Sequence, residues 1–272
     1  MIKLVTIDLD GTLFDNLKNV SEENKIAISK CKSLGVKIVI ATGRPISGVK
    51  PLLDLLGLNT KDDYVILYNG AKIINCNTYE EIYSSNISGK DVKKLYMESK
   101  KLNVFFHAFR SNGELITPLS NQYTDVEANI NHIKDNYHDI VSLKDDELFL
   151  KAMMVGSDFD VSRIINEIDN KYKDKYSMLR SSKIFLEFLD KHTSKGEALK
   201  SLAKYLNIDL KDTMAIGDAG NDIPMIKAAG VGVAMENSFP EVKKIADFIT
   251  LSNLESGVAY ALNKFIIEKE QI

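Results

Sequence analysis

The chain has 272 residues, of which 44% are hydrophobic and 27% are charged, and its formal net charge is -3. These values are typical of soluble globular proteins and exclude the fibrous, disordered and membrane-embedded classes. The lack of a basic surplus argues against a nucleic-acid partner or an anionic membrane surface.

The two cysteines, Cys31 and Cys76, show no CxxC or Cys/His spacing. They predict free thiols in a reducing cytosol and give no support for a zinc site. The N-terminus has its first Asp at position 8 and no signal-peptide pattern, and no uncharged apolar run reaches membrane-spanning length. We therefore expect a cytoplasmic protein without a membrane partner.

The first predicted element is an apolar strand over residues 2–7, of the kind buried in a parallel sheet. It ends on Asp8 and Asp10, which lie two positions apart and point to the same side of an extended chain. Their like charges repel unless a cation sits between them or one carboxyl stays protonated. This conflict is the first indication of a functional site.

The next segments alternate helix and strand. A helix is expected from the N-cap Ser21 to residue 34, then a strand over residues 36–41, and Pro45 suits the first turn of a second helix. A third strand is expected at residues 64–68. This alternation predicts a parallel α/β sheet.

Between residues 71 and 190 the alternation stops, and strand-like runs follow one another without helices between them. This order suits an antiparallel sheet with helices on one side. We predict an inserted α+β domain at residues 85–189, flanked by core segments 1–84 and 190–272. Strands are expected at 72–75, 104–109, 114–119, 148–155, 176–179 and 184–189, and helices at 91–102 and 161–172.

The alternation then resumes with Ser194 and Glu197, whose S-x-x-E spacing is that of a capping box opening a helix to about residue 206. Further strands are expected at 213–217, 231–235 and 247–250, with a helix at 223–228. The predicted fold is a Rossmann-like parallel-sheet core with an inserted α+β domain.

Each of the five main core strands ends on a polar residue: Asp8, Thr42, Asn69, Asp218 and Asn237. In open parallel sheets the carboxyl ends of the strands line one crevice, so we expect these residues on one rim. Strands that simply run into solvated loops would explain one or two such residues, but not this set.

The chemistry of this rim points to phosphoryl transfer. Oxygen ligands from Asp8 and Asp218, completed by a backbone carbonyl and waters, suit a hard cation such as Mg²⁺. Lys195 at a helix start, with the hydroxyl and N–H groups around Thr42 and Gly43, would face an anion. A metal, a lysine and amide donors around one point are the parts that such a reaction needs.

Four segments in order resemble the motifs of the haloacid dehalogenase-like (HAD) phosphohydrolases. The insertion between the second and third motifs resembles the type-2 cap of the Cof-like subfamily, and the similarity covers the whole chain. Ala219 departs from the family pattern, in which Gly is usual. The four segments are Asp8-Leu9-Asp10-Gly11-Thr12-Leu13, Ala41-Thr42-Gly43-Arg44, Lys195-Gly196 and Gly217-Asp218-Ala219-Gly220-Asn221-Asp222.

This resemblance implies a Mg²⁺-dependent phosphatase whose partner is a small phosphate ester, most often a sugar phosphate, with nucleotide and cofactor phosphates as further classes. Asp8 would be the nucleophile that forms an aspartyl-phosphate. Asp10 would be the acid and base, with its backbone carbonyl on the metal. Lys195 would stabilise the nucleophile and the developing charge, and Thr42 with Gly43 would bind phosphoryl oxygens.

The resemblance also assigns the remaining motif residues, some with two open roles. Asp218 would be the second carboxylate on the metal, and Asp222 would hold Lys195 or a metal-bound water. Asn221 would contact phosphate or support its turn. Arg44 would reach a substrate anion or pair with a carboxylate. Loop ordering and ligand contact are both open for Asn69 and Asn237.

Two other functions would use the same residues. A phosphomutase would need the phosphoenzyme to survive until a second hydroxyl attacks it. A catalytically idle phosphate-binding module would have no need of the acid and base that Asp10 supplies, which argues against it.

Overall fold

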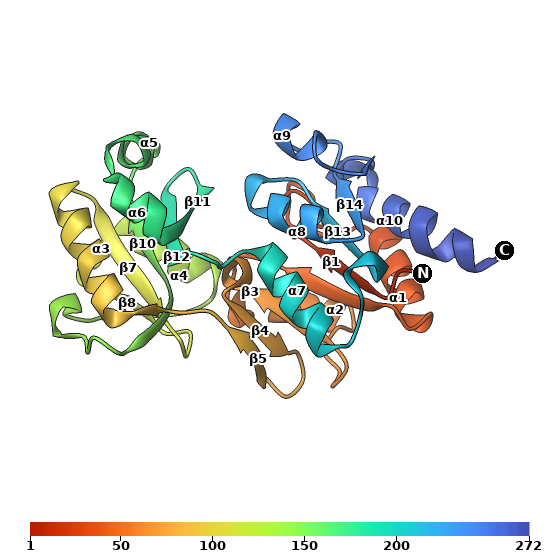
Figure 1. The fold of residues 1–272 in the computed structure, drawn as a ribbon, viewed down its shortest axis with the longest axis horizontal. Helices are drawn as coiled ribbons and strands as arrows, with labels where there is room; N and C mark the ends of the chain where they lie inside the picture. Colours follow the sequence, from red (N-terminus) through yellow and green to blue (C-terminus); the bar gives the residue numbers. More distant parts are fainter. Residues whose placement is uncertain (272) are drawn as a thin grey trace. The chain divides into compact units, whose positions relative to one another are not determined.

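The computed structural model describes residues 1–271 of the 272, and the side chains of residues 1–269. Contacts divide the chain into two compact units (Figure 1). Unit 1 comprises residues 1–43, 50–83 and 194–272, and unit 2 comprises residues 44–49 and 84–193.

The two units have the two predicted architectures. Unit 1 is built on a mostly parallel sheet and unit 2 on a mostly antiparallel one, so the predicted α/β core with an inserted α+β domain is confirmed. The limits at residues 85 and 189 stay a prediction. Residues 44–49 group with unit 2, although the prediction placed them in the core.

The sheet of unit 1 has eight strands in the order β15-β14-β13-β1-β2-β3-β4-β5. The six strands from β15 to β3 pair in parallel, whereas β4 pairs antiparallel with β3. The predicted parallel strands are present within two residues of their expected ends. The strands are β1 (Leu4–Ile7), β2 (Lys37–Ala41), β3 (Tyr64–Leu67), β4 (Lys72–Asn75), β5 (Glu81–Ser84), β13 (Thr213–Gly217), β14 (Val231–Ala234) and β15 (Phe248–Ile249).

Helices cover both faces of this sheet (Figure 1). The helices α7 (Lys195–Tyr205) and α8 (Ile223–Ala228) bury apolar side chains against β1, β2 and β13. On the other face lie α1 (Glu22–Ser33) and α10 (Gly257–Leu262). The parallel strands are therefore buried on both sides, which explains their continuous apolar sequences. Two short helices, α2 (Lys50–Leu55) and α9 (Pro240–Lys243), complete the layers.

The sheet of unit 2 runs β11-β12-β10-β7-β8-β9, with β6 paired to β10. All its pairs are antiparallel except β8 with β9. Its strands are β6 (Ile87–Ser88), β7 (Phe105–Arg110), β8 (Leu115–Thr117), β9 (Asp135–Tyr137), β10 (Leu148–Val155), β11 (Tyr176–Ser182) and β12 (Phe185–Asp190).

The helices of unit 2 differ from the prediction in two ways. The predicted helix at 161–172 is two helices, α5 (Asp158–Glu167) and α6 (Asn170–Lys175), because Ile168 is extended and Asp169 caps the second helix. The expectation of helices on one side of the sheet is wrong. Besides α3 (Gly89–Lys101) and α5, a further helix, α4 (Gln122–Ile130), packs near β7.

The position of α4 follows from the side-chain alternation along β7. Phe106 and Ala108 pack into the apolar cluster formed with α3 and α5. His107 points to the opposite face, where Thr124 of α4 lies 3.0 Å from its Nδ1. The sequence of α4 is short and polar, and its N-cap Asn121 is the one local signal for it.

Charged side chains also lie buried on this face of the sheet. Lys151 is 1% exposed, and its Nζ lies 3.1 Å from Glu187 and 3.7 Å from Glu127 of α4. It also lies 5.0 Å from the centre of the Phe109 ring. Burial lowers the pKa of His107 to about 3, and the nearby charge of Lys151 acts in the same direction.

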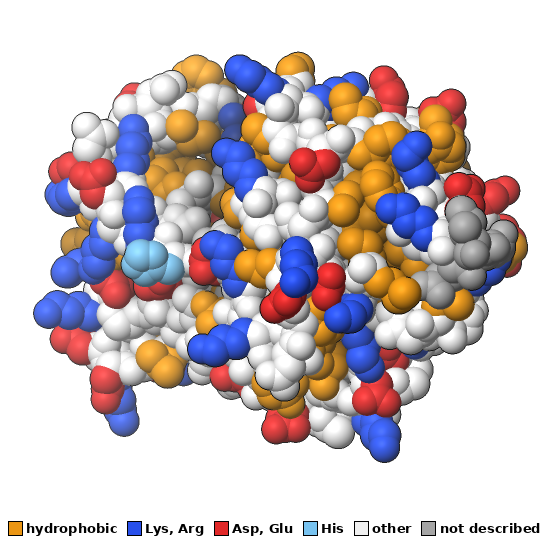
Figure 2. Space-filling model, turned by 45° about the vertical axis from the view of Figure 1, so that its right-hand side comes forward, with side chains coloured by type: hydrophobic (Ala, Val, Ile, Leu, Met, Phe, Trp, Pro, Cys, Tyr) orange, Lys and Arg blue, Asp and Glu red, His pale blue; other side chains and the backbone are white. Residues whose placement is uncertain are grey.

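On the surface seen in Figure 2, lysine and arginine side chains alternate with acidic ones over the molecule. Among the described residues, no helix combines the length and the apolar character that crossing a bilayer requires.

The buried His107 predicts a pH dependence of stability. Its pKa is about 3 in the folded state and 6.5 in an ordinary environment, so the unfolded chain binds the extra proton between these values. Stability is therefore lost as pH falls below 6.5. Between pH 7.5 and pH 5 this group should lower the free energy of unfolding by about 2 kcal/mol.

Urea unfolding of the wild type and of His107→Gln at both pH values tests this expectation. The variant should lose the contribution of His107 and show a correspondingly smaller pH dependence. The same change at the exposed His192 should leave the pH dependence unaltered. An equal pH dependence in wild type and His107→Gln would contradict it.

Candidate active site

The topology of the core sheet brings two carboxylates together. β1 pairs in parallel with β2 on one side and with β13 on the other. The strand order therefore runs to β2 and β3 on one side of β1, and to β13 and β14 on the other. Such a reversal of strand order opens a crevice at the carboxyl ends. Asp8 follows β1 and Asp218 follows β13, and the N–H of Asp8 donates to the carbonyl oxygen of Ile216 at 3.0 Å.

The centre of the site is a lysine between two carboxylates. The Nζ of Lys195 donates to Oδ1 of Asp8 at 2.5 Å and to Oδ1 of Asp222 at 2.7 Å. Lys195 and Asp222 are 0% exposed and Asp8 is 6% exposed. Lys195 is the first residue of α7, which Ser194 caps by accepting the N–H of Glu197 at 3.1 Å.

Asp222 also shapes the loop after β13. Its Oδ2 accepts the N–H groups of Asp218 and Ala219 at 3.0 and 3.1 Å. A Cβ on Gly217 would lie 2.4 Å from the Cβ of Asp222, so only glycine permits this approach. Both oxygens of Asp222 therefore have partners within the protein.

Asp218 is positioned from the first motif. The hydroxyl of Thr12 donates to its Oδ1 at 2.8 Å. Gly11 has φ +92, and a Cβ there would lie 2.5 Å from Oδ2 of Asp218. The amide of Asn237 donates to the carbonyl oxygen of Gly11 at 2.8 Å, and its Oδ1 accepts the N–H of Asn253. Asn237 thus orders this loop.

The carboxylates carry more negative charge than the lysine compensates. Asp8, Asp218 and Asp222 each place an oxygen within 4.8 Å of the others. Burial and the charge of Asp222 hold the pKa of Asp8 well above its usual range, and the same causes raise the pKa of Asp218 to about 6. Burial alone would lower the pKa of Lys195, but the charges of Asp222 and Asp8 raise it. An all-oxygen donor set with excess negative charge suits a hard divalent cation.

The second motif lies beside a pair of asparagines. Thr42 is 1% exposed, its N–H donates to Ile66, and its carbonyl oxygen accepts the N–H of Asn69 at 2.9 Å. A Cβ on Gly43 would lie 2.9 Å from the amide of Asn69. The Nδ2 of Asn221 donates to Oδ1 of Asn69 at 3.2 Å. These contacts favour the loop-ordering role for both asparagines.

Asp10 and Arg44 also lie outside the carboxylate cluster. The side chain of Asp10 is exposed, and its Oδ1 accepts a hydrogen bond from Lys18 at 2.5 Å. Arg44 belongs to unit 2, where its charge opposes the rise that burial causes in the pKa of Glu127. No role was predicted for Thr12 or Lys18. The position of Thr12 inside the first motif was a usable signal for it, whereas Lys18 had none.

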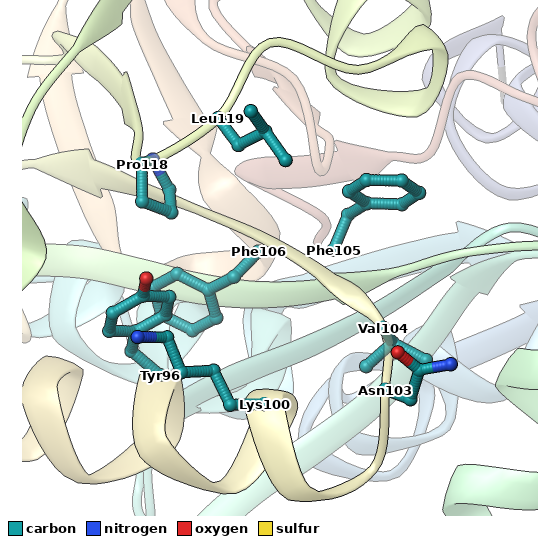
Figure 3. A pocket seen from close by; sticks show the side chains of 8 residues that line it. All are labelled: Tyr96, Lys100, Asn103, Val104, Phe105, Phe106, Pro118 and Leu119. Carbon is teal, nitrogen blue, oxygen red and sulfur yellow. The ribbon is translucent and has the colours of Figure 1, made fainter.

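A pocket of about 380 Å³ lies elsewhere, within unit 2 (Figure 3). It is lined by aromatic and aliphatic side chains of α3, β7 and the segment after β8, with Lys100 at its edge. None of its lining residues belongs to the predicted site. They are Tyr96, Lys100, Asn103, Val104, Phe105, Phe106, Pro118 and Leu119.

The close approach of Gly11 to Asp218 predicts that Gly11→Ala displaces this carboxylate. A misplacement of about 1 Å within an active site costs roughly 100-fold in rate, so hydrolysis of a generic phosphate ester should fall by about that factor. Gly35→Ala is a matched control, because Gly35 has φ +81 and no atom within 4 Å of the added Cβ. The control should keep its turnover. Equal losses in the two variants would show that backbone strain, and not the displaced carboxylate, is responsible.

Comparisons with known proteins place this chain in a family. A model described as haloacid dehalogenase-like hydrolase matches residues 5–262. The curated Bacillus subtilis (strain 168) protein "Putative phosphatase YxeH" is 40% identical over 271 residues, 99% of this chain and 100% of that protein. In the same organism, 5-amino-6-(5-phospho-D-ribitylamino)uracil phosphatase YwtE is 30% identical over 292 residues, 97% of this chain and 98% of that protein.

A comparison with solved structures points to the same family. A crystal structure of a haloacid dehalogenase-like hydrolase from Bacteroides thetaiotaomicron matches with a TM-score of 0.85 and 31% identity, covering 98% of this chain and 100% of that one. Since these similarities extend over nearly the whole chain and its relatives are named as phosphatases, the chain belongs to the haloacid dehalogenase-like hydrolases and is a phosphatase.

Proposed function

We propose that the protein is a Mg²⁺-dependent phosphatase of small phosphorylated metabolites that works through an aspartyl-phosphate intermediate. The observation that carries this proposal is the buried contact of Lys195 with Asp8 and Asp222, beside Asp218. A carboxylate held by a lysine, next to further carboxylates that can bind a cation, is equipped to attack an electrophile that is itself anionic.

The donor set fits Mg²⁺. Three carboxylates face one ammonium, so the cluster carries two uncompensated negative charges when all are ionised. Asp8, Asp218 and the backbone carbonyl of Asp10 would hold the cation. When bound, it supplies Lewis-acid polarisation of the phosphoryl group and neutralises charge that develops on its oxygens. Both oxygens of Asp222 already have protein partners, Lys195 on Oδ1 and two backbone N–H groups on Oδ2, which favours a role in holding Lys195 over direct ligation.

In the first step an oxygen of Asp8 would form a bond to phosphorus while the bond from phosphorus to the leaving oxygen breaks. Protonated Asp10 would donate its proton to that oxygen, which keeps the electron pair of the broken bond. Lys195 orients Asp8 through the 2.5 Å contact and would compensate charge on the transferring group. Thr42 and the N–H of Gly43 would bind phosphoryl oxygens.

In the second step water would attack phosphorus, and Asp10 would take its proton. The bond from phosphorus to Asp8 breaks, which regenerates the carboxylate and releases phosphate. Asn221 would support the loop that carries Asp218 and Asp222, as its hydrogen bond to Asn69 suggests.

The substrate class is a small phosphate ester, and sugar phosphates are our first choice. The relative YwtE is named for an ester on a ribityl chain, which is also a polyol phosphate. Nucleotide and cofactor phosphates are the further classes. Arg44 would bind a substrate anion or pair with a carboxylate.

Removal of the metal tests the cofactor and the substrate class together. A rate panel of phosphorylated sugars, nucleotides and cofactors should show turnover with Mg²⁺ and none after EDTA treatment, with recovery on adding Mg²⁺ back. Titration calorimetry should show weaker Mg²⁺ binding by Asp218→Asn, independently of turnover. Full activity in EDTA would refute the metal assignment.

The nucleophile is tested by trapping the phosphoenzyme. Acid quenching during turnover of a radiolabelled phosphate ester should leave label on the wild type and none on Asp8→Asn, whose amide is a poor nucleophile. Asp62→Asn, at an exposed aspartate outside the site, should label normally. Ordinary turnover by Asp8→Asn would assign the nucleophile to another residue.

A further inference from the structure

The loop that follows β1 is built as a tight, self-bonded turn. Oδ1 of Asp15 accepts the N–H groups of Leu17 and Asn19, each at 2.8 Å. The N–H of Asp15 donates to the carbonyl oxygen of Asn19 at 3.0 Å. At the base of the loop the carbonyl oxygen of Phe14 accepts a hydrogen bond from the side-chain amide of Asn253 at 2.9 Å. Asp10 and Phe14 also form an isolated β-bridge there. The loop is thereby ordered on both sides of its tip.

Lys18 stands at this tip with a backbone that lysine rarely adopts. Its φ is +64, a region favoured by glycine and asparagine. Its N–H donates to the carbonyl oxygen of Asp15 at 3.1 Å, which fixes this conformation. Lysine has a conformational cost at this position that glycine would not have, which motivates a functional role for its side chain.

That side chain reaches Asp10. The Nζ of Lys18 lies 2.5 Å from Oδ1 of Asp10, and the two side chains are 57% and 43% exposed. An exposed ion pair adds little to stability, because solvent screens it and two flexible side chains must be held. The geometry of the loop is therefore better explained by what it does to Asp10 than by stability.

We propose that Lys18 is a positioning residue for the acid–base carboxylate of Asp10. An ammonium has three donors and no acceptor, so it holds Oδ1 as an acceptor and leaves the catalytic proton to Oδ2. This inference rests on the proposed function of Asp10. As the bond from phosphorus to the leaving oxygen breaks, the proton moves from Oδ2 to that oxygen, and the carboxylate that results stays paired with Lys18.

The same contact serves the return step. Asp10 takes a proton from the attacking water onto Oδ2, while Lys18 holds Oδ1 in place. Lys18 thus acts through Asp10 and touches neither phosphorus nor the nucleophile. Its loss should cost most where the leaving oxygen depends on protonation.

The test compares kcat/KM for an alkyl phosphate and for p-nitrophenyl phosphate, whose leaving group needs no proton. The value of kcat/KM reports only the steps up to release of the alcohol, so the base role of Asp10, which belongs to the later step, does not affect it. Lys18→Met, which keeps the same backbone requirement, should lower kcat/KM for the alkyl phosphate about fivefold or more. With p-nitrophenyl phosphate it should change less than about twofold, and Lys18→Arg should recover most of the loss.

Two controls separate positioning from structure. Lys25→Met removes a lysine paired with exposed Glu22 in α1 and should leave both ratios unchanged. Adding Lys18→Met to Asp10→Asn should cause no further loss, because Lys18 acts through Asp10.

Each outcome bears on one claim. Equal losses on both substrates with Lys18→Met, no loss on either, or a further loss in the Asp10→Asn background would overturn the role of Lys18. If Asp10→Asn itself lowers kcat/KM equally for both substrates, the proposed acid role of Asp10 fails instead. A selective loss in Asp10→Asn without one in Lys18→Met removes the further inference alone.

Discussion

The contact on which the site depends is one buried ammonium shared by two buried carboxylates. Lys195 lies 187 residues from Asp8 and 27 from Asp222 in the chain, and all three are nearly or fully buried. Removing one partner from such a group leaves an uncompensated buried charge, which typically costs about 3–5 kcal/mol. The fold therefore holds the three side chains together, and removing any one of them would lower the stability of the fold.

Bringing Lys195 to the strand ends requires α7 to begin in a very narrow space. A Cβ on Gly70 would lie 2.2 Å from the carbonyl oxygen of Ser194, and one on Gly196 would lie 2.4 Å from that of Pro224. Gly70 has φ +101, so it also makes the turn after β3. The first turn of α7 thus fits between this turn and α8 only because two glycines leave room for its backbone. The position of the lysine is a consequence of backbone packing before any charge acts.

Much of this could be predicted from sequence because the signals are local. Apolar runs ending on Asp8, Thr42 and Asp218 predicted the parallel strands. Because the carboxyl ends of such strands share one edge of the sheet, they also predicted that the polar residues group there. The second helix in the predicted 161–172 segment and the helix α4 were not predicted, because polar, short helices lack an apolar period. The pairing of Lys18 with Asp10 was also invisible, since it depends on a left-handed backbone at one loop residue.

The two aspartates that end β1 show how environment, and not residue type, divides the work. Asp8 is 6% exposed, and its charge is set by Lys195 and two further carboxylates. The side chain of Asp10 is 43% exposed and faces a solvated lysine. In the proposed mechanism the buried group bonds to phosphorus, and the exposed one exchanges protons with the leaving group and with the attacking water. Two chemically identical carboxyls two residues apart can take different roles because the sheet buries one and the loop carries the other out.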